Sequence, residues 1–107
     1  MQGPANLDDD ALARVVEHVA DRLRHLDASR LRRVGEPVRR HLAALAALAL
    51  SAEGLPPRPL PEVPDSALGD VVAVLGHDLS QALRRSPDDH LRVRAAAVLT
   101  DLRRCLP

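Results

Sequence analysis

Aromatic residues, isoleucine and lysine are absent from this 107-residue sequence, so all 15 basic residues are arginines. A core of leucine, valine and alanine lets helices approach closely, but it lacks the large area that one aromatic side chain buries. Phe, Tyr, Ile and Lys have AT-rich codons, so their absence indicates a GC-rich genome, for which we expect a bacterial source. These absences concern packing and codon usage, and they identify no function.

The chain also lacks a net charge, a second cysteine and a long hydrophobic run. Its basic and acidic residues balance to a formal net charge of zero, so no long-range field attracts nucleic acid or anionic lipid, and self-association is favoured. The single Cys105 excludes an internal disulfide and fits a reducing compartment, so we expect a cytoplasmic protein.

Two further absences argue against membrane targeting. The longest stretch free of Asp, Glu, Arg and His, residues 42–52, is about half of the ~20 residues that a transmembrane helix needs. The first residues do not combine a basic segment with an apolar run, as a signal peptide would. We therefore expect no membrane partner.

Apolar residues recur at helical spacing in four stretches, and they predict an all-α fold. The predicted helices span residues 8–26, 28–53, 66–85 and 87–105. Residues that suit an N-cap stand at the start of each helix, and Gly54 suits the end of the second. For the fourth helix we expect Ser86 as the cap and Pro87 at the first helical position.

Pro37 lies inside the second predicted helix. A proline removes one backbone hydrogen bond there and clashes with the preceding turn. The apolar stripe nevertheless continues from Leu31 through Val38 to Leu45, so we expect a kink near Pro37 and not an end.

Residues 54–65 are rich in proline and predict a linker between two helical hairpins. Each hairpin needs the apolar face of the other, so the prediction is a four-helix bundle in a single domain of residues 1–107. In polyproline II form, the segment 55–64 reaches about 30 Å at ~3.1 Å per residue, enough to run along the bundle. A sharp turn is equally compatible with the sequence, so the topology stays open.

Residues 58–64, RPLPEVP, resemble a ligand of SH3 domains, with a basic residue followed by two apolar-proline pairs. The resemblance implies a polyproline II strand that docks on an aromatic groove of a partner. The alternative is a stiff spacer, which we favour because such partners are not expected for a bacterial chain.

No motif typical of catalysis or cofactor binding stands out, so we expect a protein that is not an enzyme and carries no cofactor. His18, Asp21 and His25 share one helical face at a spacing that metal sites use, but that face lies opposite the apolar stripe. We interpret them, and the His77–Asp78 pair, as exposed polar positions.

Cys105 lies on an apolar stripe and is interpreted as a small core residue.

The second predicted helix is apolar around most of its circumference near residues 42–50. Such a helix must be covered on more than one side, by its own bundle or by another chain. We therefore expect a protein that acts by protein–protein contact, as a homo-oligomer or as an accessory subunit of a larger partner. The predicted interface residues are Leu45, Leu48 and Leu50, with Val74 and Val93, which lie off the stripes of the last two helices.

The alternative is a regulator that binds nucleic acid through the arginine-rich face of the second helix. Its phosphate contacts would be Arg32, Arg33, Arg39 and Arg40. Zero net charge and the lack of aromatic side chains to stack on bases argue against this alternative.

Overall fold

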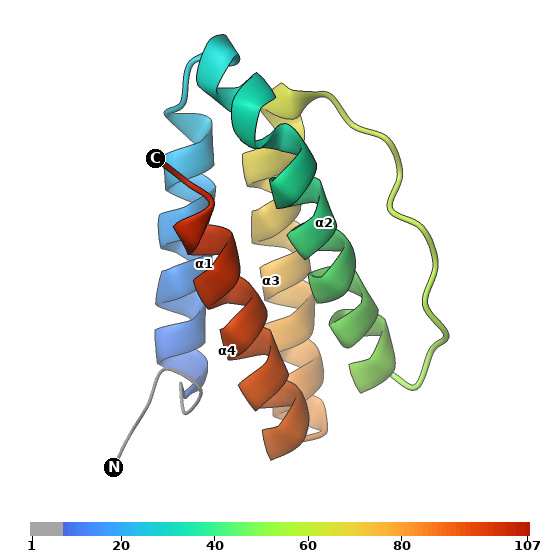
Figure 1. The fold of residues 1–107 in the computed structure, drawn as a ribbon. Helices are drawn as coiled ribbons and strands as arrows, with labels where there is room; N and C mark the ends of the chain where they lie inside the picture. Colours follow the sequence, from blue (N-terminus) through green and yellow to red (C-terminus); the bar gives the residue numbers. More distant parts are fainter. Residues whose placement is uncertain (1–7) are drawn as a thin grey trace.

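A computed structural model describes residues 8–107, which form four packed α-helices (Figure 1). The helices are α1 (Asp9–Arg24), α2 (Ala28–Ala52), α3 (Leu68–Arg85) and α4 (Asp89–Arg104), and a 3₁₀ turn, η2 (Asp65–Ala67), leads into α3. The prediction of an all-α helical bundle is confirmed. Among the described residues, none of the helices combines the length and the apolar character that crossing a membrane requires.

Three of the helices begin at an aspartate whose side chain caps the first turn. Asp8 accepts a hydrogen bond from the Ala11 amide at 2.8 Å, and Asp27 accepts one from the Arg30 amide at 2.9 Å. An N-cap carboxylate satisfies an amide that has no partner within the helix, and its charge suits the positive end of the helix dipole. These local signals position the starts of α1 and α2.

The start of α4 differs from the prediction. The cap is Asp88, which accepts a hydrogen bond from the Leu91 amide at 3.1 Å, and not Ser86. Ser86 has an extended backbone, with φ −141° and ψ 81°, because a residue that precedes proline avoids the helical region. Pro87 therefore lies before the cap, and the first helical residue is Asp89.

The end of α2 is set by Gly54, which has a φ of +74°. The Gly54 amide donates to the Ser51 carbonyl at 2.9 Å, and the Leu55 amide donates to the Leu50 carbonyl at 2.8 Å. This pair of bonds is a Schellman motif, and the left-handed conformation that it needs is available to glycine at little cost. The motif turns the chain out of α2 and leaves Leu55 at the surface.

Helix α2 continues through Pro37, as the unbroken apolar stripe predicts. Its first turns lean across the top of the bundle, and the remainder runs down the side (Figure 1). A bend is expected at this place, because Pro37 has no amide to donate to the carbonyl of the preceding turn.

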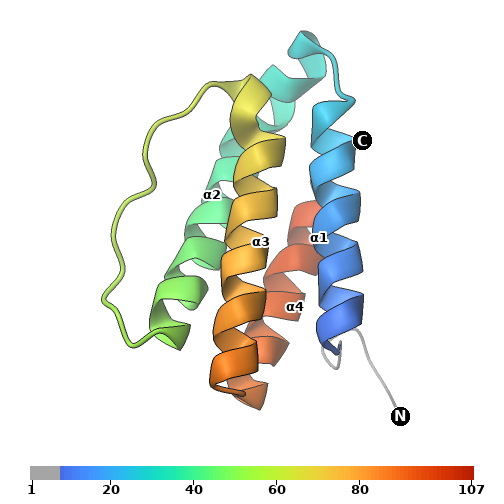
Figure 2. The same cartoon turned by 180° about the vertical axis from the view of Figure 1, so that it is seen from behind.

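The segment 55–64, which we call the crossover segment, has no regular secondary structure. It leaves the end of α2 and returns along the outside of the bundle to the opposite end, where α3 begins (Figures 1 and 2). As a result α2 and α3 run in the same direction, while α1 and α4 run the opposite way. Of the two paths that the sequence left open, the chain follows the one along the bundle.

The main packing pairs are not the two expected hairpins. Helix α1 packs chiefly on α3, and α2 packs on both α3 and α4. The expected pairing of α1 with α2 and of α3 with α4 as two hairpins is therefore not confirmed. Because α2 has a neighbour on each side, a wide arc of its surface is covered within the chain.

The contact between α1 and α3 is close because small residues face it. A Cβ built on Gly76 would lie 2.7 Å from Cγ2 of Val16, and one built on Gly69 would lie 2.9 Å from the carbonyl oxygen of Ala20. Both distances are shorter than any normal contact of a side-chain carbon. The two glycines therefore let α1 approach α3 more closely than any other residue would.

The core between the helices is aliphatic throughout. Within residues 8–107 no polar or charged residue is buried, and no buried side-chain nitrogen or oxygen lacks a hydrogen-bond partner. The largest fully buried side chains come from all four helices and are Val19, Leu23, Val38, Leu42, Leu45, Leu68, Val72, Leu83, Leu99 and Leu102.

Candidate functional site

The structure divides the five predicted interface residues into two groups. Leu45 is completely buried and Leu48 is only 4% exposed, so both belong to the core of the chain itself. Leu45 therefore cannot contact another chain in the folded state, because α3 and α4 together cover the side of α2 that the sequence left without a neighbour, whereas Leu48 still lines a hollow beside α4. Val74 and Val93 are 58% and 39% exposed.

Val74 lies at an apolar hollow, which we call the crossover groove. This groove runs between the crossover segment and the seam of α2 and α3, and its volume is about 760 Å³. Leu60 and Val63 line it from the crossover segment. The helices contribute Leu42, Ala43, Leu68, Val71, Val74 and Leu75.

The crossover segment is held over this seam by apolar and polar contacts. Leu60 and Val63 are partly buried and pack against the core. Arg39 of α2 donates to the Val63 carbonyl and to the Asp65 carboxylate, both at 2.7 Å. These contacts fix the outer wall of the groove, and they also occupy the apolar side chains of the motif that resembles an SH3 ligand.

Leu60 separates the crossover groove from a smaller hollow next to it. This second hollow, of about 250 Å³, is lined by Ala46, Ala49 and Leu50 of α2 and by Pro59 and Leu60 of the crossover segment. Leu50, the remaining predicted interface residue, is half-buried there. It therefore lies beside the surface that Val74 marks, at the other end of the crossover segment.

The outer face of α3 places carboxylates on both sides of Val74. Asp70 and Asp78 lie four residues before and after it, so they share its helical face. Glu62 contributes a third carboxylate from the crossover segment. The groove thus combines an apolar floor with an acidic rim.

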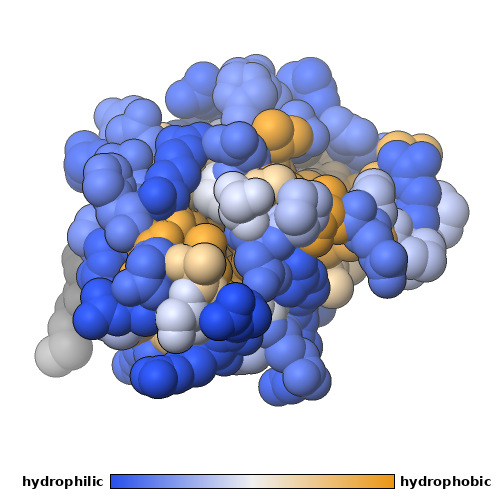
Figure 3. Space-filling model, turned by 90° about the horizontal axis from the view of Figure 1, so that it is seen from above, coloured by the Kyte–Doolittle hydropathy of each residue, from blue (hydrophilic) through white to orange (hydrophobic). Residues whose placement is uncertain are grey.

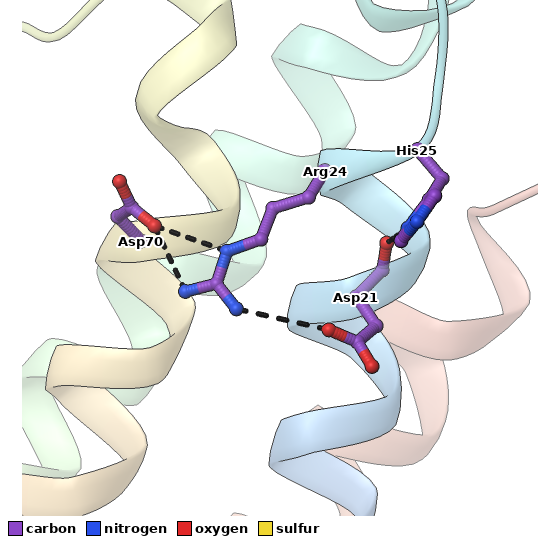
Figure 4. A network of polar contacts seen from close by, with 4 residues as sticks. All are labelled: Asp21, Arg24, His25 and Asp70. Carbon is purple, nitrogen blue, oxygen red and sulfur yellow. Dashed lines mark hydrogen bonds and ion pairs between the residues drawn. The ribbon is translucent and has the colours of Figure 1, made fainter.

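Asp70 also joins α3 to α1 through an ion pair (Figure 4). Both Nε and Nη2 of Arg24 donate to one oxygen of the Asp70 carboxylate, at 3.0 and 2.8 Å. On its other side the guanidinium lies 3.8 Å from the carboxylate of Asp21. The single charge of Arg24 is thus shared between two acids, and Asp70 remains largely exposed on the rim.

A different apolar surface lies between α2 and α4, and we call it the α4 face. It surrounds a hollow of about 540 Å³ lined by Ala44, Ala47, Leu48, Leu55, Pro57, Ala97 and Val98. Leu55 is 48% exposed, and Val93 lies one helical turn before Ala97. The only charged side chain in the lining is that of Arg94. No periodic pattern marks Leu55 in the sequence, because it follows the end of a helix.

The predicted arginine face is only partly available for phosphate. Arg39 is held by Asp65 and Val63, and Arg40 lies 3.6 Å from the carboxylate of Glu36. Arg32 and Arg33 are exposed near the start of α2. The end of the bundle that carries the start of α2 is mostly hydrophilic, with apolar patches between the charged side chains (Figure 3).

The histidines that share a face with Asp21 are exposed on α1. Nδ1 of His25 donates to the backbone carbonyl of Asp21 at 2.7 Å, and the Asp21 side chain faces Arg24 instead of the histidine (Figure 4). In the described part of the chain, no three side chains of His, Cys, Asp or Glu gather closely enough to hold a metal ion.

Cys105, predicted as a core residue, is half-buried at the end of α4. Its sulfur lies 3.7 Å from Nδ1 of His41 on α2. The same nitrogen lies 2.8 Å from the Pro37 carbonyl, which can only accept, so Nδ1 carries the proton. The pair therefore joins the end of α4 to the bend in α2.

Comparisons of the chain with known protein families, with curated proteins and with solved structures found no match. The surfaces described above are therefore the basis for assigning a function.

Proposed function

We propose that this protein is not an enzyme and acts by binding another protein chain through the crossover groove. The observation that carries the proposal is the position of Val74, which is 58% exposed beside an apolar groove of about 760 Å³. A branched aliphatic side chain next to an apolar hollow is the kind of surface that a partner covers, since such contacts concentrate binding energy in a dry centre with a polar rim.

A protein partner fits this groove better than a small molecule does. Pockets for small ligands combine apolar walls with a few polar groups that converge on the ligand. Here the guanidinium of Arg39 already binds Asp65 and Val63, and Asp70 already binds Arg24. Val74 lines the groove and is 58% exposed, so a second protein surface can cover it together with the floor of the groove.

Site-specific photo-crosslinking in the cells that produce the protein tests this proposal. A photoreactive residue replaces Val74 or Ala43, both of which line the groove, and a matched control replaces Arg14, which is exposed on α1. We expect the same discrete adduct from positions 74 and 43 and none from position 14. A Val74→Glu substitution should abolish the adduct formed from position 43.

Two results would refute the proposal. One is the absence of a discrete adduct from both groove positions. The other is an equal set of adducts from position 14, because it would show contact without selectivity for the groove.

Binding to nucleic acid is the alternative proposal, and exposed Arg32 and Arg33 support it. Phosphate contacts weaken as salt rises, so this function predicts a salt-dependent gel shift that Arg32→Ala with Arg33→Ala removes. The absence of a shift at low salt would exclude it.

A further inference from the structure

The crossover groove and the α4 face lie on different sides of the same helix. Ala43 of α2 lines the groove, whereas Ala44 and Ala47 line the α4 face. Successive residues of a helix point about 100° apart, so one helix presents an apolar wall to each surface. A single copy of the chain therefore carries two distinct apolar surfaces.

The charges around these two surfaces are of opposite sign. The rim of the crossover groove carries Glu62 and Asp70, with Asp78 one turn beyond Val74. Arg24 is shared between Asp70 and Asp21, and Arg39 is paired with Asp65, so the balance of charge around the groove remains negative. The α4 face has Arg94 as its only charged lining residue. Opposite charges around two apolar surfaces favour contact between them and disfavour contact of either surface with itself.

Leu55 gives the α4 face an exposed apolar side chain that an apolar hollow can receive. It lines the α4 face and is 48% exposed just after the turn that ends α2. The chain as a whole has no net charge, so two copies do not repel each other at long range.

We propose that the crossover groove of one copy binds the α4 face of a second copy, with Leu55 entering the groove beside Val74. This inference rests on the proposed function, and it names the partner as another copy of the same chain. The contact joins two different surfaces, so each added copy leaves one groove and one α4 face free. Assembly therefore grows with concentration and does not stop at a symmetric dimer.

Light scattering on the purified full-length chain over a micromolar-to-millimolar dilution series tests the inference. Val74→Glu blocks the groove, since it adds a carboxylate to an acidic rim, and Leu55→Glu blocks the α4 face, since its carboxylate would meet that rim. Both positions are exposed, so the far-UV circular dichroism and the melting temperature should not change. Arg14→Glu on α1 is the control, and Val74→Ser with Leu55→Ser is a milder second pair.

The wild type and the Arg14→Glu variant should show a mass that rises steadily with concentration. Each blocked variant alone should stay a monomer. An equimolar mixture of the two should give a dimer and nothing larger, because one copy keeps its groove and the other keeps its α4 face.

Three results would overturn the inference: a wild type that is monomeric at every concentration, a wild-type mass that stops at a dimer, or a mixture that stays monomeric. None of them refutes the proposed function, because photo-crosslinking would still detect a different protein in the groove. Conversely, an adduct with twice the mass of the chain would support both proposals.

Discussion

Replacing Gly76 by alanine tests the close packing of α1 on α3, on which the helix order depends. A Cβ at this position would contact Cγ1 of Val16 and would lie 2.7 Å from Cγ2 and 3.1 Å from Cβ of the same residue. Because Cβ of Val16 is itself too near, a rotation about its χ1 does not relieve the contact. The two helices would have to move apart.

Two opposing effects decide the size of the change. Alanine is favoured over glycine inside a helix by about 1 kcal/mol. Inserting a methyl group into a well-packed contact costs about 1–3 kcal/mol. The contact with a β-branched residue that is 7% exposed leaves little room for adjustment, so we expect a net loss of about 1–2 kcal/mol in the free energy of unfolding.

Urea denaturation followed by circular dichroism measures this change, and Val16→Ala supplies the partner for a double-mutant cycle. Removing the two methyl groups of Val16 should make Gly76→Ala less destabilising than it is in the wild type. A Gly76→Ala variant that is more stable than the wild type, with no coupling to Val16, would show that α1 does not pack on α3 in this way.

The remaining predictions concern the core, the ends of the helices and the turn after α2. Leu48→Ala should reduce the free energy of unfolding by about 2–5 kcal/mol, because Leu48 is buried. Val74→Ala should change it by less than about 0.5 kcal/mol, because Val74 is exposed. Equal losses of stability in urea denaturation would contradict the burial of Leu48. Asp9 and Arg92 form a partly buried ion pair between α1 and α4. A double-mutant cycle on the free energy of unfolding should therefore give a favourable coupling of about 1 kcal/mol between them. The absence of any coupling would contradict this ion pair. Gly54→Ala should lower the stability by about 1–2 kcal/mol because Gly54 has a left-handed backbone, and a neutral effect on the melting curve would contradict this conformation.

The helices follow from the sequence because their signals are local. Asp8 and Asp27 act within one turn of their own positions, and the stripe through Leu31, Val38 and Leu45 continues across Pro37. Ser86 was the wrong choice of cap: the helix begins two residues later, with Asp88 as its cap, because the Asp88 carboxylate accepts the hydrogen bond from the Leu91 amide.

The order of the helices could not be predicted, because it depends on the path of the crossover segment and on contacts between distant residues. The length of this segment permits a path along the bundle, and two sets of contacts hold it there: Leu60 and Val63 pack against the core, and Arg39 of α2 binds Val63 and Asp65. Gly76 gave no signal by itself either, since its role depends on Val16 of a helix sixty residues earlier in the chain.

The sequence indicated the exposure of some residues at the candidate surfaces and not of others. Val74 and Val93 are exposed, as their positions off the apolar stripes indicate. The burial of Leu45 and Leu48 was not foreseen, because the sequence shows how much of α2 is apolar but not how much of it α3 and α4 cover. Leu55 was missed because it lies in a turn, where no periodicity applies.

Contact with another chain is proposed at the crossover groove, beside Val74, and no contact is expected at the buried core of α2. Methyl NMR of the labelled wild type, recorded as its concentration rises, tests this claim most directly. We predict concentration-dependent shifts at the methyl groups of Val74, Leu60 and Leu55, with those of the completely buried Leu45 unchanged. Shifts at Leu45 with none at Val74 would contradict this prediction.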